Sequence, residues 1–260
     1  MKKLFLIAIV SFVALATMSF TAGKGVTLRL RPSKDKAYVI TSKTTQTTAM
    51  KIQGQTMRSS QTIEGRQTFT AKEVSANANV FETQIDVITM NISTMGMNMS
   101  YDSEHPENTS PMIADQAKSF DDIIKKPSTI TYDELGHNTN SENMEMSQLT
   151  NIIIELPEEE LKEGSQWNYV KSQKVSDNDV NINMTYTVTG ISKKSVELSL
   201  TGTIDTKGIT GTYNGTASID PQTGLIMAST ISNSLSMTVS EQGMEIPMTI
   251  TGTTTISVKE

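Results

Sequence analysis

The sequence contains no cysteine. This absence excludes disulfides, thiol nucleophiles and cysteine-based metal sites. It also excludes a lipid-modified N-terminal cysteine, so we do not expect a lipoprotein. A folded domain of this composition must be stabilised by burial of apolar side chains and by backbone hydrogen bonds alone.

Aromatic residues and basic charge are also scarce. Aromatic residues make up 5% of the sequence, so Ile, Val, Leu and 16 methionines must fill the core, which favours adaptable packing. Lysine and arginine number 22 against 28 aspartates and glutamates, a net charge of −6. No basic cluster interrupts this acidity, which argues against nucleic acid as a partner and against electrostatic docking on anionic lipid.

Recognisable catalytic motifs are missing. The two histidines, His105 and His137, have no H-x-H or H-x-x-x-H spacing. No G-x-S-x-G elbow, phosphate loop or dinucleotide glycine fingerprint occurs. Because neither a nucleophile with its base nor a poised acid pair can be named, we expect a protein that is not an enzyme and has no cofactor.

One acidic stretch, YDSEHPE at 101–107, has side chains that can ligate metal ions. It groups Asp102, Glu104, His105 and Glu107, a set that suits Ca²⁺ or a transition metal. Asp102 and Glu104 of this stretch are also the candidates for an unrecognised hydrolytic site. A solvated loop between a strand and a helix is the interpretation that we favour.

The first 22 residues have the layout of a cleavable export signal. Lys2 and Lys3 precede an apolar run from Leu4 to about Ala16, and small and polar residues follow. The run is short for a membrane span, and no stop-transfer pattern follows it. We expect residues 1–22 to be a signal peptide and the protein to be periplasmic or associated with the cell envelope; an uncleaved anchor is the alternative.

Alternation of apolar and polar residues dominates the rest of the chain. In VNINMTYTV (180–188), five apolar residues share one face, while Asn and Thr occupy the other. This period of two is typical of half-buried antiparallel strands. It recurs clearly at 196–204, 209–219, 225–239 and 248–258, and less regularly at 38–52, 61–74 and 80–92, where a change of parity indicates a bulge near Val87.

Two segments depart from this alternation. Residues 111–126 have Pro at the first helical position and an apolar face of Ile113, Ala117, Phe120 and Ile124, which predicts a helix. Residues 142–164 predict a helix at 142–151 and a helical turn from Pro157 to Gly164. ITYDELG (130–136) indicates a hairpin between these two segments.

About ten strands and so few helices predict a mainly β fold. The apolar strand faces exceed what the helices can cover, so the sheet must curve on itself, pack against a second sheet, or keep part of its face for a ligand. We predict one large curved antiparallel sheet, a half-barrel or barrel-like fold, with a two-sheet sandwich as the alternative. Residues 23–260 form a single β-rich domain in this interpretation, with halves 23–140 and 156–260 as a weak internal repeat.

Methionines cluster at MNISTMGMNMS (90–100), where we place Met95, Met97 and Met99 on one strand face. Clustered thioethers can bind Cu(I). Alternate methionines can also form an adaptable ligand wall or an ordinary core, and the ordinary core is the interpretation that we favour. Trp167, the only tryptophan, is interpreted as a plug at the end of the sheet, with ligand stacking as the alternative. The candidate apolar wall consists of Met95, Met97, Met99, Ile113, Phe120, Ile124 and Trp167.

Three stretches carry a resemblance to known proteins. LRLRPSKDKAYVITSKTTQTTAMKIQGQTM (28–57), YDSE (101–104) and LPEEELKEGSQW (156–167) resemble an uncharacterised family of exported bacterial proteins, although the family more often has Gly-Asp-x-Trp near the tryptophan. The resemblance implies an envelope or secreted location and no catalytic residues. More loosely, the predicted fold is similar to periplasmic lipoprotein carriers, which is an analogy of fold.

Three hypotheses for the function follow. The first is a carrier that encloses an apolar ligand, such as a lipid or a lipoprotein segment, in a curved sheet. The second is an envelope assembly protein that binds protein partners through strand edges. The third is a hydrolase with an acidic site near Asp102 and Glu104. A continuous apolar hollow favours the first, a bare edge the second, and converging carboxylates the third.

The signal layout generates a direct prediction. N-terminal sequencing of the mature protein should give a start between about Thr17 and Lys24, because cleavage follows the small residues after the apolar run. An intact Met1 on protein from the soluble cytoplasmic fraction would contradict export.

Overall fold

The computed structural model describes residues 25–260 except 53, 76, 141–151, 176–177, 207 and 242–243. The expected signal peptide at 1–22 and the expected helix at 142–151 therefore lie outside the described residues. Within the described part, no helix is long and apolar enough to cross a membrane.

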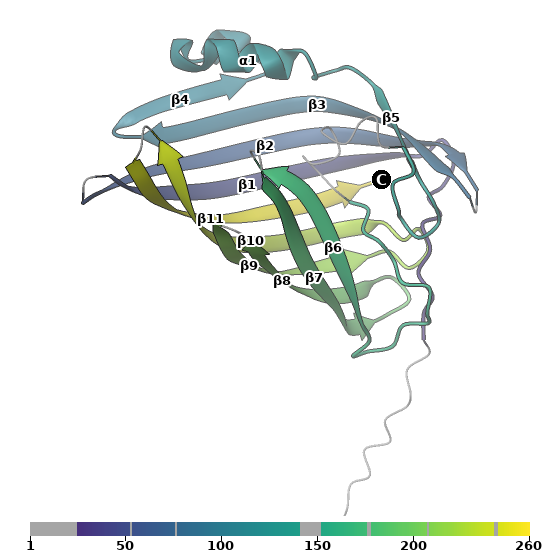
Figure 1. Ribbon diagram of the computed structural model, residues 1–260. Helices are drawn as coiled ribbons and strands as arrows, with labels where there is room; N and C mark the ends of the chain where they lie inside the picture. The colour runs from purple at the N-terminus through teal and green to yellow at the C-terminus, as the bar shows by residue number, and fades with distance from the viewer. Residues whose placement is uncertain are drawn as a thin grey trace, which may run out of the picture.

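One antiparallel sheet of eleven strands forms the molecule (Figure 1). Its order is β4-β3-β2-β1-β11-β10-β9-β8-β7-β6, and β5 pairs with β3 beside this path. The strands are β1 (Ala37–Ile52), β2 (Gln55–Val74), β3 (Asn79–Thr94), β4 (Met97–Asp102), β5 (Ser128–Tyr132), β6 (Gln166–Val175), β7 (Asn178–Ile191), β8 (Val196–Thr206), β9 (Ile209–Ile219), β10 (Ile226–Glu241) and β11 (Met244–Lys259).

The sheet curls but does not close, because β4 and β6 at its two margins do not pair with each other. Figure 1 shows β6 and β7 turned across the direction of the long central strands. This confirms the predicted large curved antiparallel sheet, and the two-sheet sandwich is wrong. The two meanders meet at the centre, where β1 pairs with β11. Whether the two halves are a duplication stays a prediction.

Strand register places the apolar residues of all the long strands on one face, here called the inner face. Ile40 on β1 lies opposite Val258 on β11 and Gln67 on β2, and the alternation continues across the sheet. Intervening residues such as Thr251 and Thr253 form an outer face rich in Thr and Ser. The alternation predicted from the sequence therefore becomes a mainly apolar inner face, on which polar residues such as Thr44, Gln46 and Thr48 of β1 also lie.

Glycines relieve crowding on the inner face where the sheet bends. A Cβ at Gly211 would lie 2.6 Å from the backbone oxygen of Ser234 and 2.5 Å from a methyl group of Leu235. At Gly215 it would lie 2.9 Å from the Cα of Ile231. Neighbouring side chains thus lean over these glycines, and the curvature requires their missing side chains.

Two segments without regular structure close one end of the inner face. We call residues 25–31 and 152–161 the plug, which lies at one end of the sheet in Figure 1. Val26 and Leu161 pair in an isolated antiparallel bridge. The predicted helical turn at 157–164 is wrong, because Leu161 hydrogen-bonds to Val26 through both backbone groups instead of to a helical turn. The buried plug residues are Leu28, Leu30, Ile152, Ile153, Leu156 and Leu161.

The predicted helix at 111–126 is present but shorter. Short 3₁₀ turns at Pro106–Asn108 and Pro111–Ile113 precede α1 (Ala114–Asp121), which lies beside β4 (Figure 1). The helix ends early because the Lys125 N–H bonds to the Ile85 carbonyl and Ile124 forms a bridge with Ile85. The predicted apolar helix face packs on the inner face of β3 and β4, in a second cluster with Ile85, Ile88, Met90 and Tyr101.

The predicted bulge near Val87 is confirmed. The β2–β3 register shifts between the pair Arg66–Val87 and the pair Gln67–Ile85, which leaves Asp86 as the extra residue. The Asp86 carboxylate accepts a hydrogen bond from the Thr68 hydroxyl at 2.7 Å. The bulge keeps both Ile85 and Ile88 on the inner face, although three positions separate them in the sequence.

The crowding around Gly211 can be tested by one added methyl group. Gly211→Ala should lower the free energy of unfolding by about 1–3 kcal/mol, because the methyl group collides with backbone and with Leu235. Gly190→Ala is the matched control in another strand, since its Cβ would lie 3.9 Å from the nearest atom. Denaturant unfolding should place this control within about 0.5 kcal/mol of wild type, and equal losses in both variants would contradict the crowding.

Candidate functional site

The central part of the inner face is covered neither by the plug residues nor by the second cluster. This part is formed by four neighbouring strands, β2, β1, β11 and β10. They extend to the end of the sheet that lies opposite the plug, and we call that end the far end. Their inner-face side chains are only partly buried, with apolar residues beside polar ones such as Thr44 and Gln46, and we call this surface the trough. Its apolar members are Met50, Met57, Ile231, Leu235, Met237, Ile246, Met248, Ile250 and Ile256.

A small cavity of about 100 Å³ lies between α1 and the sheet. Phe120, Ile85 and Ile88 are among its apolar lining, and Ser42 and Thr44 come from β1. Pockets for small-molecule ligands usually enclose roughly 300–1,000 Å³, so the cavity by itself is too small for a whole lipid. Because its β1 residues lie on the inner face, it adjoins the trough.

The predicted methionine face needs a correction. Met95 lies in the β3–β4 turn with φ of 50°, followed by Gly96 with φ of 81°. Two successive residues with positive φ are typical of the tight two-residue turn of a hairpin, so Met95 cannot share a strand face with Met97 and Met99. Met95 is 68% exposed and Met97 43% exposed, and their interpretation as core is wrong. Met99 is partly buried against the second cluster.

The structure brings together four of the seven predicted wall residues. Ile113, Phe120, Ile124 and Met99 belong to the second cluster or pack against it. Trp167 lies apart, stacked on Tyr186 with ring centroids 5.1 Å apart. Its indole N–H donates a hydrogen bond to the Glu155 carbonyl at 3.0 Å, which ties β6 to the segment that forms the plug. That the wall residues contact a ligand stays a prediction.

Sequence reasoning missed the residues of the trough. Alternation assigns Met50 or Ile250 to an apolar face, but it does not say which strands are neighbours. Only the β1–β11 register places Met50 opposite Met248. The available signal was that isolated methionines and isoleucines occupy alternate positions of their strands and so lie on the apolar face. This signal identifies a common surface only when the pairing of the strands is known.

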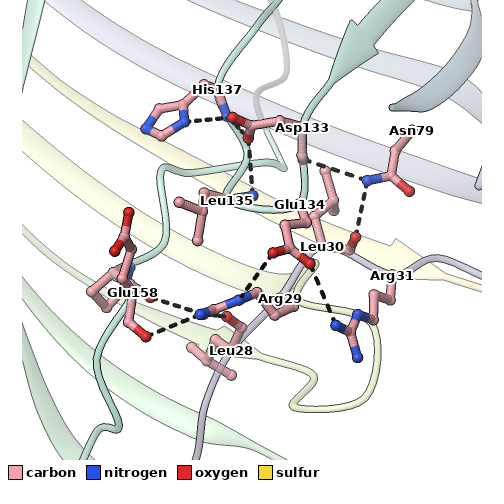
Figure 2. A network of polar contacts seen from close by, with 11 residues as sticks. Leu28, Arg29, Leu30, Arg31, Asn79, Asp133, Glu134, Leu135, His137 and Glu158 are labelled. Atoms are coloured by element: carbon pink, nitrogen blue, oxygen red, sulfur yellow. Dashed lines mark hydrogen bonds and ion pairs between the residues drawn. The ribbon is translucent and has the colours of Figure 1, made fainter. Parts of the chain in front are cut away.

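A polar network fastens the plug at its outer side (Figure 2). The Arg29 guanidinium donates to the carbonyls of Leu28, Pro157 and Glu158 at 2.7, 3.1 and 3.0 Å. It also lies 3.7 Å from the Glu134 carboxylate. The side-chain amide of the buried Asn79 donates to the Leu30 carbonyl at 3.0 Å. One guanidinium therefore holds both plug segments and the loop after β5 together.

His137 stands between two carboxylates in this network. Its Nδ1 lies 2.7 Å from Asp133 and its Nε2 3.7 Å from Glu155. The hydrogen bond to Asp133 raises the pKa of His137. Partial burial acts to raise the pKa of Asp133, but hydrogen bonds from His137 and Leu135 outweigh it and lower that pKa. Burial raises the pKa of Glu155, and the nearby imidazolium opposes this change.

The acidic stretch at 101–107 is organised as a turn. The Asp102 carboxylate accepts the N–H groups of Glu104 and His105 at 2.9 and 3.3 Å. Glu104 lies 3.2 Å from Arg66, and both side chains are about half exposed. Across the described ranges, no group of three or more His, Cys, Asp or Glu side chains is placed to hold a metal ion. The Asp102 carboxylate thus shapes the turn through local hydrogen bonds, and Glu104 pairs with Arg66 on β2.

The His137 pair predicts a pH-dependent stability. A raised histidine pKa stabilises the fold fully below the unfolded value of about 6.5, and this contribution is lost as the pH rises through the folded value. The lowered Asp133 pKa contributes above about 3.9 and is lost as the pH falls through its folded value. In denaturant unfolding, His137→Gln should therefore lower the free energy of unfolding more at about pH 5 than at about pH 9. In a protein that already carries Asp133→Asn, the effect of His137→Gln should depend little on pH. An unchanged pH dependence would contradict the pairing of His137 with Asp133.

Comparison with known proteins places part of the chain in context. Residues 132–226, from the end of β5 to the start of β10, match the profile of a "Family of unknown function (DUF6263)". No curated protein matches the chain. The structure titled "Lipid-protein interactions in lipovitellin" matches with a TM-score of 0.52 and 11% identity over 88% of this chain. The chain spans 25% of the length of that lipovitellin chain, and at this identity the likeness concerns the fold alone.

A second solved structure is an outer membrane channel from Pseudomonas putida F1. It is 8% identical over 91% of this chain and 98% of the channel, with a TM-score of 0.25, a likeness too weak to carry an argument.

The family match confirms the expected resemblance to an uncharacterised family. Between residues 132 and 226, this chain is similar to a protein family whose function is unknown.

Proposed function

We propose that the protein is a non-enzymatic carrier that holds an apolar ligand, a lipid or a lipoprotein segment, in the trough. The observation that carries this proposal is the partly exposed apolar surface on the inner face, between the cluster under α1 and the plug. Contiguous exposed apolar surface on a soluble domain marks a binding region. The signal expected at 1–22 would deliver such a carrier to the periplasm or cell envelope.

The trough has the energetic means to hold a chain-like guest. Burial of apolar surface gains about 25 cal/mol per Å², so a guest that covers on the order of 200 Å² gains roughly 5 kcal/mol before the costs of association. Ile250 and Met248 are only partly buried in the absence of a guest. Because association itself costs several kcal/mol, the net binding energy is smaller than this gain, and tight binding needs a guest that covers a larger apolar area.

The closed end sets the direction in which a guest lies. The plug fills the inner face beside Tyr38 and Phe69, so a chain cannot pass through that end. The far end has no such cover among the described residues. A guest would therefore enter the trough from the far end. Hydroxyl and amide groups on the trough floor, such as Thr44, Gln46 and Asn233, offer additional hydrogen bonds.

The comparisons support this proposal only at the level of fold. The lipovitellin structure, whose title concerns lipid–protein interactions, has a related arrangement of strands. The sequence resemblance to exported proteins and the looser similarity to periplasmic lipoprotein carriers agree with it. The family matched at 132–226 has no known function, so the ligand is argued from the trough itself.

A second candidate function uses the sheet margin at β6. This strand pairs with β7 on one side, and no strand of the described residues pairs with its other side. An extended segment of an envelope protein could add to this edge as a further strand. By contrast, the β4 margin is partly occupied, since Ser100 and Ser110 exchange backbone and side-chain hydrogen bonds there.

The carrier proposal predicts opposite results for two adjacent residues. Ile250 faces the trough and Thr251 faces outward. Ile250→Asn should weaken uptake of a fluorescent fatty acid about tenfold or more, because a polar amide replaces apolar contact worth roughly 1.4 kcal/mol. Thr251→Asn is the matched control and should bind like wild type. Binding should respond little to salt, since the trough lining is uncharged.

Native mass spectrometry with lipid extraction would identify the natural guest. Protein purified from its own envelope should retain a lipid or a lipid-modified peptide. A wild-type protein that neither binds any fluorescent fatty acid nor retains any co-purified lipid would contradict the carrier proposal and favour partner binding at β6. Equal loss of uptake in both residue 250 and 251 variants would also count against the trough as the site.

A further inference from the structure

Four methionines form an unbroken row across four neighbouring strands. Met57 on β2 lies opposite Met50 on β1, Met50 lies opposite Met248 on β11, and Met248 lies opposite Met237 on β10. These residues share the inner face near the far end of the trough. They come from four separate strands and form no sequence motif, so the row exists only in the folded sheet.

The methionines of this row are accessible and do more than fill the core. All four are partly exposed. Met237 packs against the larger buried cluster, whereas Met50, Met57 and Met248 are not among the residues of either cluster or packed against them. A methionine that fills a gap in a core is normally surrounded by other buried side chains. The row instead lies partly exposed on the inner face of the sheet.

The spacing and chemistry of the row suit a soft metal ion. Residues directly opposite each other in antiparallel strands have Cβ atoms about 4.5–5.5 Å apart, and the three rotatable bonds of methionine let neighbouring sulfurs converge. Two sulfurs that bind one ion at about 2.3 Å lie at most about 4.6 Å apart, which this spacing permits. Thioethers are neutral, soft ligands that select Cu(I) among the biological metals.

We propose that the methionine row binds a monovalent soft metal ion, Cu(I), through Met50, Met248 and their row neighbours Met57 and Met237. Met50 and Met248 hold the central positions, so each can share an ion with the other and with one outer methionine. A monovalent charge is the one that an uncharged, half-apolar surface tolerates best. This inference does not depend on the carrier function, since it concerns the sulfurs and not the apolar area.

Replacement of methionine by leucine separates metal binding by the sulfur from the apolar contact of the side chain. Leucine keeps the apolar volume and removes the sulfur, and such exchanges usually cost less than about 1.5 kcal/mol. The test uses the double variant Met50→Leu/Met248→Leu. Its matched control is Met95→Leu/Met112→Leu, which removes two methionines that are 68% and 66% exposed and lie outside the row. Fatty-acid uptake is measured separately on the wild-type protein, so a failed carrier proposal would be recognised independently of the metal measurement.

Binding can be measured with Ag(I), a redox-stable substitute for Cu(I), and with Cu(I) in competition with a chromophoric chelator under reducing conditions. Wild type and the control variant should bind with equal affinity, and the row variant should bind at least tenfold more weakly. Methyl resonances of Met50, Met57, Met237 and Met248 should shift on titration, while those of Met95 and Met112 stay in place. Equal affinity of all three proteins, or larger shifts at Met95 and Met112, would overturn the proposal.

Discussion

The antiparallel pairing of β1 with β11 is the interaction on which the rest of the structure depends. It runs over twelve residue pairs, from Val39–Lys259 to Met50–Met248, and joins the two meanders into one sheet. Because side chains alternate between faces, a slip of one residue here would turn the apolar face of one meander outward. The trough and the packed surface beneath the plug both require this single register, whereas the cluster under α1 forms within the first meander.

Much of the fold follows from local pattern. Alternation in VNINMTYTV and its counterparts identifies strands, since a half-buried strand must repeat every two residues. The same logic located the bulge beside Val87 and the apolar face of α1. It failed where distant contacts override local preference: Leu161 leaves its expected helical turn for a bridge with Val26, and Ile124 leaves the helix for a bridge with Ile85.

The candidate site was harder to predict than the fold. The conspicuous methionines at 95–99 drew attention because they are close in sequence, yet Met95 belongs to a turn that needs two residues of positive φ. The row of Met57, Met50, Met248 and Met237 is scattered along the chain and depends on strand order. Residue types and alternation predict which faces are apolar, whereas adjacency between strands comes from tertiary structure.

The central position of the β1–β11 pair also has a consequence for the order of folding. Strands close in sequence can pair as soon as they exist, but β1 must wait for β11, from which it is separated by most of the chain. Closure of so long a loop carries a large entropic cost, and folds dominated by such distant pairs form slowly. Until that step, β1 and β11 both present unpaired edges to other chains. A folding intermediate with both of these edges open is therefore more exposed to aggregation than the completed sheet.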